Sequence, residues 1–196
     1  MSQEMFPGKV SPVAAAGFVG LMSLFNMGGR FFWASTSDYI GRKNTYFVFM
    51  VLGCLLYIAV PHTDSIGSVA AFVLCFLVII SMYGGGFATV PAYLKDMFGT
   101  RYVGAIHGLL LTAWSMAGIF GPVLVNYIRE YNITHGVPKA QAYNVTMYIM
   151  AGLLVIGFIC NLLVKPVHHR FHMQPEADKA LATAAEAGAA RPAPSG

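Results

Sequence analysis

The chain has 196 residues, of which 57% are hydrophobic and only 10% are charged, whereas a soluble domain carries about 25% charged residues. So much apolar surface cannot be hidden inside a globule of this size, so we predict an all-α membrane protein whose partner is the lipid bilayer. The net charge of +4 is scattered without a run of Lys or Arg, so we predict no nucleic-acid partner.

Five segments are apolar enough to cross a bilayer core, which needs about 20 residues per helix. They cover residues 13–35, 46–60, 69–93, 103–128 and 143–164, with turns expected at 37–44, 61–67, 95–101 and 129–142. We therefore predict a five-helix transmembrane domain over 13–164. The polar segment 1–12 precedes it without the apolar core of a signal peptide, and the Ala/Pro/Gly-rich segment 165–196 is predicted to be a disordered tail.

Basic residues are distributed unevenly between the two ends of these segments. Six lie at one set of ends: Arg42, Lys43, Lys95, Arg101, Lys165 and Arg170. Three lie at the other: Lys9, Arg129 and Lys139. Because cytoplasmic loops carry more Lys and Arg, we predict a cell (inner) membrane protein with its N-terminus outside and its tail in the cytoplasm.

The first apolar segment contains one arginine, which is the candidate substrate ligand. Arg30 lies eight positions before Asp38, about 12 Å inside the membrane face, where a charge costs about 2.5–3.5 kcal/mol on insertion scales. Helical spacing predicts a polar stripe of Ser23, Asn26, Arg30, Trp33 and Ser37. Such a stripe is expected to point into a helix bundle or a water-filled path rather than at lipid. The planar guanidinium of Arg30 suits a carboxylate. The alternative is a structural arginine paired with a carbonyl or a carboxylate elsewhere in the protein.

The next feature is the sequence GRFFWASTSDYIGRK, residues 29–43. Asp38 is expected to end a helix at the membrane face and can pair with a basic residue. Gly41 permits a tight reversal, and Arg42 and Lys43 anchor the loop at the membrane face. The pattern resembles the G-x-x-x-D-x-x-G-R-K loop motif of the major facilitator superfamily, with Ala34 replacing its leading glycine. An ordinary basic loop is the alternative interpretation.

The fourth segment adds Gly108, Gly118 and Gly121-Pro122, which resemble the glycine-proline pattern on the fifth helix of a superfamily half. This order resembles helices eight to twelve of a twelve-helix carrier, so the resemblance implies part of the C-terminal half. The N-terminal half and helix seven would then be missing partners. Residues 84–108, GGGFATVPAYLKDMFGTRYVGAIHG, resemble the oxalate/formate antiporter family.

That resemblance implies transport of small organic anions, with Arg30 as the helix-eight arginine that binds substrate in oxalate carriers. Those carriers have a second cation, a lysine, where this chain has Trp114. A single cation suits one carboxylate better than two, so a monocarboxylate such as formate, pyruvate or lactate is favoured over oxalate.

Three further residues are candidates for the transport path. Tyr83, beside three glycines, offers a hydroxyl, although a packed core aromatic is the alternative. His107 shares a helical face with Trp114, and histidine is the side chain best suited to exchange protons at physiological pH, so it is a candidate to carry a coupling proton unless it only packs between helices. Pro91 interrupts the third segment and is predicted to kink it, which favours a role in gating.

Enzymatic chemistry is not predicted, because the five segments contain no Asp or Glu. The cysteines Cys54, Cys75 and Cys160 lie in apolar surroundings without metal-ligand spacing, so neither a metal site nor a cofactor is expected. The sequence thus predicts a fragment of a secondary transporter that works by alternating access within a complete carrier. The alternatives are a truncated or vestigial non-transporting protein, or a small helical module that binds partner helices.

Overall fold

The computed structural model describes residues 6, 8, 10–139, 141–165 and 183, and all regular structure among them is helical. The long helices are α2 (Pro12–Ile40), α3 (Arg42–Ile66), α4 (Val69–Phe98), α5 (Val103–Thr134) and α6 (Asn144–Leu163). All five are long and apolar enough to cross a membrane, which confirms the predicted fold class. Most of the predicted segments 1–12 and 165–196 lie outside the described residues.

The helices extend further than the sequence predicted. The loop expected at 37–44 is a single residue, Gly41, whose φ of +86° allows α3 to begin at once after α2. The turn expected at 61–67 is helical to Ile66 and contains Pro61, and α4 and α5 likewise continue through residues predicted to be loops. The reason is the length of the helices. Helices α2, α4 and α5 have 29–32 residues and are about 44–48 Å long, which is about the thickness of a bilayer including its headgroup layers. Hydropathy detects only the stretch that crosses the hydrocarbon core of the bilayer, which is about 30 Å thick.

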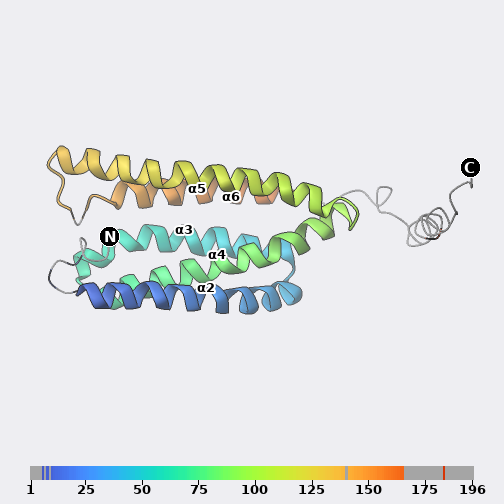
Figure 1. Cartoon of the computed structure of the whole chain (residues 1–196), viewed down its shortest axis with the longest axis horizontal. Helices are drawn as coiled ribbons and strands as arrows, with labels where there is room; N and C mark the ends of the chain where they lie inside the picture. Colours follow the sequence, from blue (N-terminus) through green and yellow to red (C-terminus); the bar gives the residue numbers. More distant parts are fainter. Residues whose placement is uncertain (1–5, 7, 9, 140, 166–182, 184–196) are drawn as a thin grey trace, which may run out of the picture.

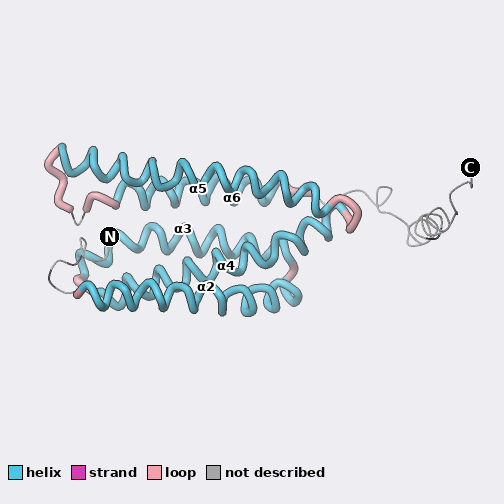
Figure 2. The backbone as a smooth tube through the Cα atoms, in the orientation of Figure 1, coloured by secondary structure: helices cyan, strands magenta, loops and turns pink. Residues whose placement is uncertain are grey.

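Packing is strongest between α2 and α4 and between α3 and α6, while α3 also lies against α4. In Figure 1 the helices follow the long axis of the molecule, with α5 and α6 along one side and α2 along the other. The connections between the described helices lie at the two ends of the bundle, as Figure 2 shows. A small apolar core of Phe6, Val60, Phe72 and Met147 closes one end.

Glycines bring the backbones of α2 and α4 into direct contact. A methyl group added to Gly29 would lie 2.2 Å from the carbonyl oxygen of Ser81, and one added to Gly84 would lie 2.2 Å from that of Asn26. Small residues at membrane helix interfaces permit this close approach, and dispersion contacts between the backbones then stabilise the pair. The α2–α4 pair is therefore the most tightly fitted part of the bundle.

Helix α5 is packed very differently from the others. None of its 32 residues is buried, and it touches α4 and α6 over far fewer residues than join α2 to α4. Its glycines Gly104, Gly108, Gly118 and Gly121 have no neighbouring atom within 4 Å of an added methyl group. Helix α5 therefore presents most of its surface to its surroundings.

Candidate functional site

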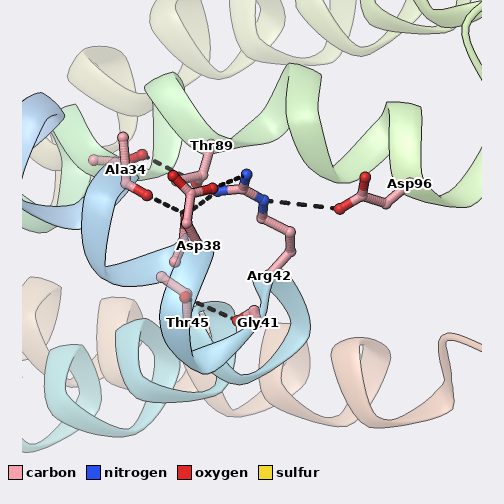
Figure 3. A network of polar contacts seen from close by, with 9 residues as sticks. Ala34, Asp38, Gly41, Arg42, Thr45, Thr89 and Asp96 are labelled. Atoms are coloured by element: carbon pink, nitrogen blue, oxygen red, sulfur yellow. Dashed lines mark hydrogen bonds and ion pairs between the residues drawn. The ribbon is translucent and has the colours of Figure 1, made fainter.

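The motif at the α2–α3 junction forms a polar network centred on Arg42, shown in Figure 3. The guanidinium of Arg42 donates to Asp38 one helical turn earlier and to the hydroxyl of Ser37. Its Nε also lies 3.8 Å from a carboxylate oxygen of Asp96, near the end of α4. Arg42 therefore ties the last turn of α2 to α4 at the membrane face.

The neighbouring Lys43 reaches in another direction, toward α6. Its Nζ donates to the carbonyl oxygens of Val164, at 2.7 Å, and Leu162, at 3.3 Å. The side chain of Asn161 returns a hydrogen bond from its Nδ2 to the Lys43 carbonyl oxygen at 3.2 Å. A cation that binds terminal carbonyls stabilises a helix C-terminus, so two consecutive basic residues join α3 to α2, α4 and α6.

Sequence reasoning did not identify Asp96 or Asn161 as members of this network. Asp38 stands four residues before Arg42, which is the helical spacing for an ion pair and is visible in sequence. Asp96 and Asn161 are more than 50 residues from Arg42 and Lys43 in the chain. No local pattern could therefore have indicated either contact.

The polar stripe predicted on the first helix divides into two parts in the structure. Trp33 is half-buried: its indole Nε1 donates to the Ser81 hydroxyl at 3.3 Å, and its side chain lies against Gly85. Ser37 is buried, and Asn26 is half-buried with its carbonyl against Gly84. Trp33 therefore packs against α4 inside the bundle, and Ser37 bonds to Arg42 at the start of α3.

Arg30 differs from these neighbours because its side chain is exposed. It follows Gly29, which touches α4, by one residue, and one residue turns a helix by about 100°. Within the described part of the chain, no hydrogen bond or ion pair satisfies its guanidinium. A charged group at membrane depth without an internal partner favours a ligand or partner supplied from elsewhere.

Three of the other candidates lie together on a cavity of about 420 Å³ between α3, α4, α5 and α6. The indole Nε1 of Trp114 donates to the hydroxyl of Tyr83 at 3.1 Å, and both side chains are about half exposed at its rim. The Nδ1 atom of His107 is buried without a hydrogen-bond partner among the described residues. Arg30, Asn26 and Trp33 do not line this cavity.

Pro91 and the three cysteines lie outside the polar contacts described above. Pro91 lies inside α4 and is exposed, one residue after Val90, which lines the cavity. The three cysteines are free thiols: Cys54 and Cys75 are half-buried and Cys160 is exposed. Among the described residues, no group of three or more His, Cys, Asp or Glu side chains is arranged to hold a metal ion.

Comparison with known proteins identifies relatives that are transporters. The oxalate:formate antiporter of Oxalobacter formigenes is 34% identical over 103 residues, which are 53% of this chain and 24% of that protein. The sialic acid transporter NanX of Escherichia coli K12 is 28% identical over 154 residues, 76% of this chain and 36% of that protein. Monocarboxylate transporter 14 of mouse is 27% identical over 122 residues, 61% of this chain and 21% of that protein.

These matches therefore span about a fifth to about a third of the length of the relatives. No solved structure matches the chain. The family model of the Major Facilitator Superfamily matches residues 9–193, nearly the whole sequence and all five membrane-length helices. The chain is therefore a multi-pass membrane protein that belongs to the major facilitator superfamily.

Proposed function

We propose that the chain forms part of the C-terminal half of a secondary transporter for small organic anions, equivalent to helices eight to twelve. The remaining helices would come from outside the described chain, and substrate would cross by alternating access between the two halves. Arg30 carries this proposal, because an exposed, unpaired guanidinium at membrane depth needs an anionic partner to offset its cost. The names of the three relatives refer to oxalate, formate, sialic acid and monocarboxylates, all of which contain a carboxylate.

We favour a monocarboxylate as the substrate. Arg30 supplies a fork of donors that matches one carboxylate bidentately, and Asn26 lies one turn earlier on α2. Trp114 stands where the resemblance to oxalate carriers implies a second cation. Its indole binds the Tyr83 oxygen, so the Tyr83 proton is free to be donated to an anion beside the rim. His107 is the proposed carrier of a coupling proton, and Pro91 the proposed flexible point of α4.

The structure also supports a second candidate, a helical module that binds partner helices. The supporting observation is α5, which crosses the membrane without a single buried residue. In the first proposal this surface packs on the remaining helices of the carrier. In the second it binds unrelated membrane helices, and no substrate moves.

The isolated 196-residue chain is expected to show no saturable exchange of labelled formate, lactate or oxalate after reconstitution into liposomes. The reason is that superfamily substrates bind between two halves, and the described residues form five membrane-length helices. The measurement compares uptake with empty liposomes, and a complete twelve-helix relative serves as the positive control. Saturable exchange by the chain alone would overturn the proposal that it needs further helices.

Orientation is tested by thiol labelling of exposed positions at opposite ends of the bundle. Thr100 lies between α4 and α5, at the end with more basic residues, and His135 lies directly after α5. The native cysteines Cys54, Cys75 and Cys160 are first replaced. A cysteine introduced at Thr100 is then expected to react with an impermeant maleimide only after the membranes are opened. A cysteine at His135 is expected to react with an impermeant maleimide in intact cells. The reverse pattern would place the basic ends outside.

A further inference from the structure

Two hollows of similar size lie on the surface of the α2–α4 pair. The first has a volume of about 340 Å³, is here called the Asn26 hollow, and is lined by Val19, Met22, Ser23, Asn26 and Ile80. The second has a volume of about 350 Å³, is here called the Gly28 hollow, and is lined by Leu24, Phe25, Gly28, Gly29, Phe32 and Ser81. Each is formed by α2 and one residue of α4, so any difference between them comes from the chemistry of their linings.

Arg30 lies on the same side of α2 as the Asn26 hollow. Relative to Gly29, which touches α4, Arg30 is turned by about 100° in one direction and Gly28 by about 100° in the other. Ser23, Asn26 and Arg30 follow one another at intervals of three and four residues, which places them on one stripe of a helix. Helical side chains lean toward the N-terminus of their helix, so the Arg30 guanidinium extends toward the turn that contains Asn26.

The Asn26 hollow lies near the middle of the membrane. Asn26 precedes Asp38, at the membrane face, by twelve residues, which is about 18 Å along a helix. The hydrocarbon core is about 30 Å thick, so Asn26 is close to its midplane, where carriers of this kind bind their substrates. Ile80 also lines the cavity that holds Trp114, so the hollow adjoins the other candidate residues of the transport path.

The two hollows differ in their unused polar groups. The side-chain oxygen of Asn26 lies beside Gly84, which has no side chain to displace it, and the amide has no hydrogen-bond partner among the described residues. The Ser23 hydroxyl donates to a carbonyl oxygen of its own helix at 3.1 Å, so its oxygen can still accept. In the Gly28 hollow, the Ser81 hydroxyl already donates to a carbonyl oxygen and accepts from Trp33. The Asn26 hollow therefore offers a ligand both a donor and acceptors.

We propose that the Asn26 hollow holds the part of the substrate beyond its carboxylate, and that Asn26 selects short monocarboxylates with a hydroxyl group on the adjacent carbon. This inference rests on the proposed function, in which Arg30 binds the carboxylate. A hydroxyl group both donates and accepts, as a side-chain amide does, so the two satisfy each other one helical turn from the guanidinium. Val19, Met22 and Ile80 supply apolar surface for the alkyl end of the substrate.

The test compares lactate with propionate, which has the same carbon skeleton without the hydroxyl group. Each competes with labelled formate for a purified complete carrier that contains this chain. We expect lactate to bind about tenfold more tightly than propionate, because propionate leaves the amide unbonded. Asn26→Leu replaces the amide with an apolar group of similar size and is expected to remove most of this preference. Formate has no second carbon, so its affinity should change by less than about threefold in Asn26→Leu.

A second pair of variants tests the alkyl end of the substrate. Val19→Phe adds a ring to the Asn26 hollow, and Leu24→Phe adds one to the Gly28 hollow. The two positions are a matched pair, since Val19 is 57% exposed and Leu24 is 60% exposed. Val19→Phe is expected to weaken binding of a longer hydroxy acid, 2-hydroxyhexanoate, about tenfold more than binding of lactate. Leu24→Phe should leave both affinities unchanged, with circular dichroism helical in both variants.

Failure of this inference differs from failure of the proposed function. Retained formate binding in Arg30→Ala would overturn the proposed function and, with it, the carboxylate end of this inference. If Arg30→Ala loses formate, equal affinities for lactate and propionate in the parent would overturn the hydroxyl selection alone. An unchanged preference in Asn26→Leu together with a lower thermal midpoint would assign the amide to a neighbouring helix of the carrier. Equal effects of Val19→Phe and Leu24→Phe would overturn the placement of the alkyl end.

Discussion

Replacing Gly29 with alanine is expected to separate α2 from α4 and to cause the largest loss of stability of any single methyl group added to this bundle. The new methyl group would lie 2.2 Å from the carbonyl oxygen of Ser81 and 2.7 Å from its Cα atom. These are backbone atoms of a continuous helix, so no side chain can rotate away and the whole helix must move. Overpacking in a well-packed core costs about 1–3 kcal/mol, and we expect at least the upper value here.

The adjacent glycine provides the matched control for this prediction. A methyl group on Gly28 meets no atom within 4 Å, so Gly28→Ala has the same helix propensity and membrane depth without the clash. Thermal unfolding and gel filtration in detergent should show a lower midpoint and more aggregation for Gly29→Ala only. Equal midpoints for the two variants would mean that the close contact between α2 and α4 does not stabilise the protein.

The second large effect is expected at Arg30 in a complete carrier that contains this chain. Arg30→Ala should weaken carboxylate binding by more than about 100-fold, because truncating one partner of a desolvated charge pair costs about 2–5 kcal/mol. Arg30→Lys keeps the charge but loses the planar fork that binds a carboxylate bidentately, so we expect a loss of at least about tenfold. The measurement is binding of labelled formate or lactate to purified variants in detergent.

Two further variants separate a substrate role of Arg30 from a structural one. Arg30→Ala is expected to fold and insert normally, because Arg30 is exposed and unpaired within the described residues. Phe31→Ala, at the next exposed position of α2, should leave binding unchanged. Trp114→Lys supplies the second cation of oxalate carriers and should shift preference toward dicarboxylates. Equal affinity in Arg30→Ala and the parent would leave Arg30 with a structural role.

The sequence by itself determined the membrane setting, the number of long helices and the superfamily. Hydropathy reports how a stretch of about 20 residues partitions into hydrocarbon, and the motif from Asp38 to Lys43 is contiguous, so both signals are local. The same locality explains the errors at helix ends, since helices continue into the headgroup layer where hydropathy changes sign. Pro61, for example, indicated a turn but lies inside α3.

Only the tertiary structure decided which residues act together. A period of 3.6 residues shows that Asn26, Arg30 and Trp33 lie near one another on α2, but not which helix each one meets. The structure packs Trp33 on α4 and leaves Arg30 facing outward. Tyr83, His107 and Trp114 share a cavity, and Arg42 meets Asp96, because helices distant in sequence are adjacent in space. These contacts depend on how closely glycines allow two backbones to approach, which no single helix specifies.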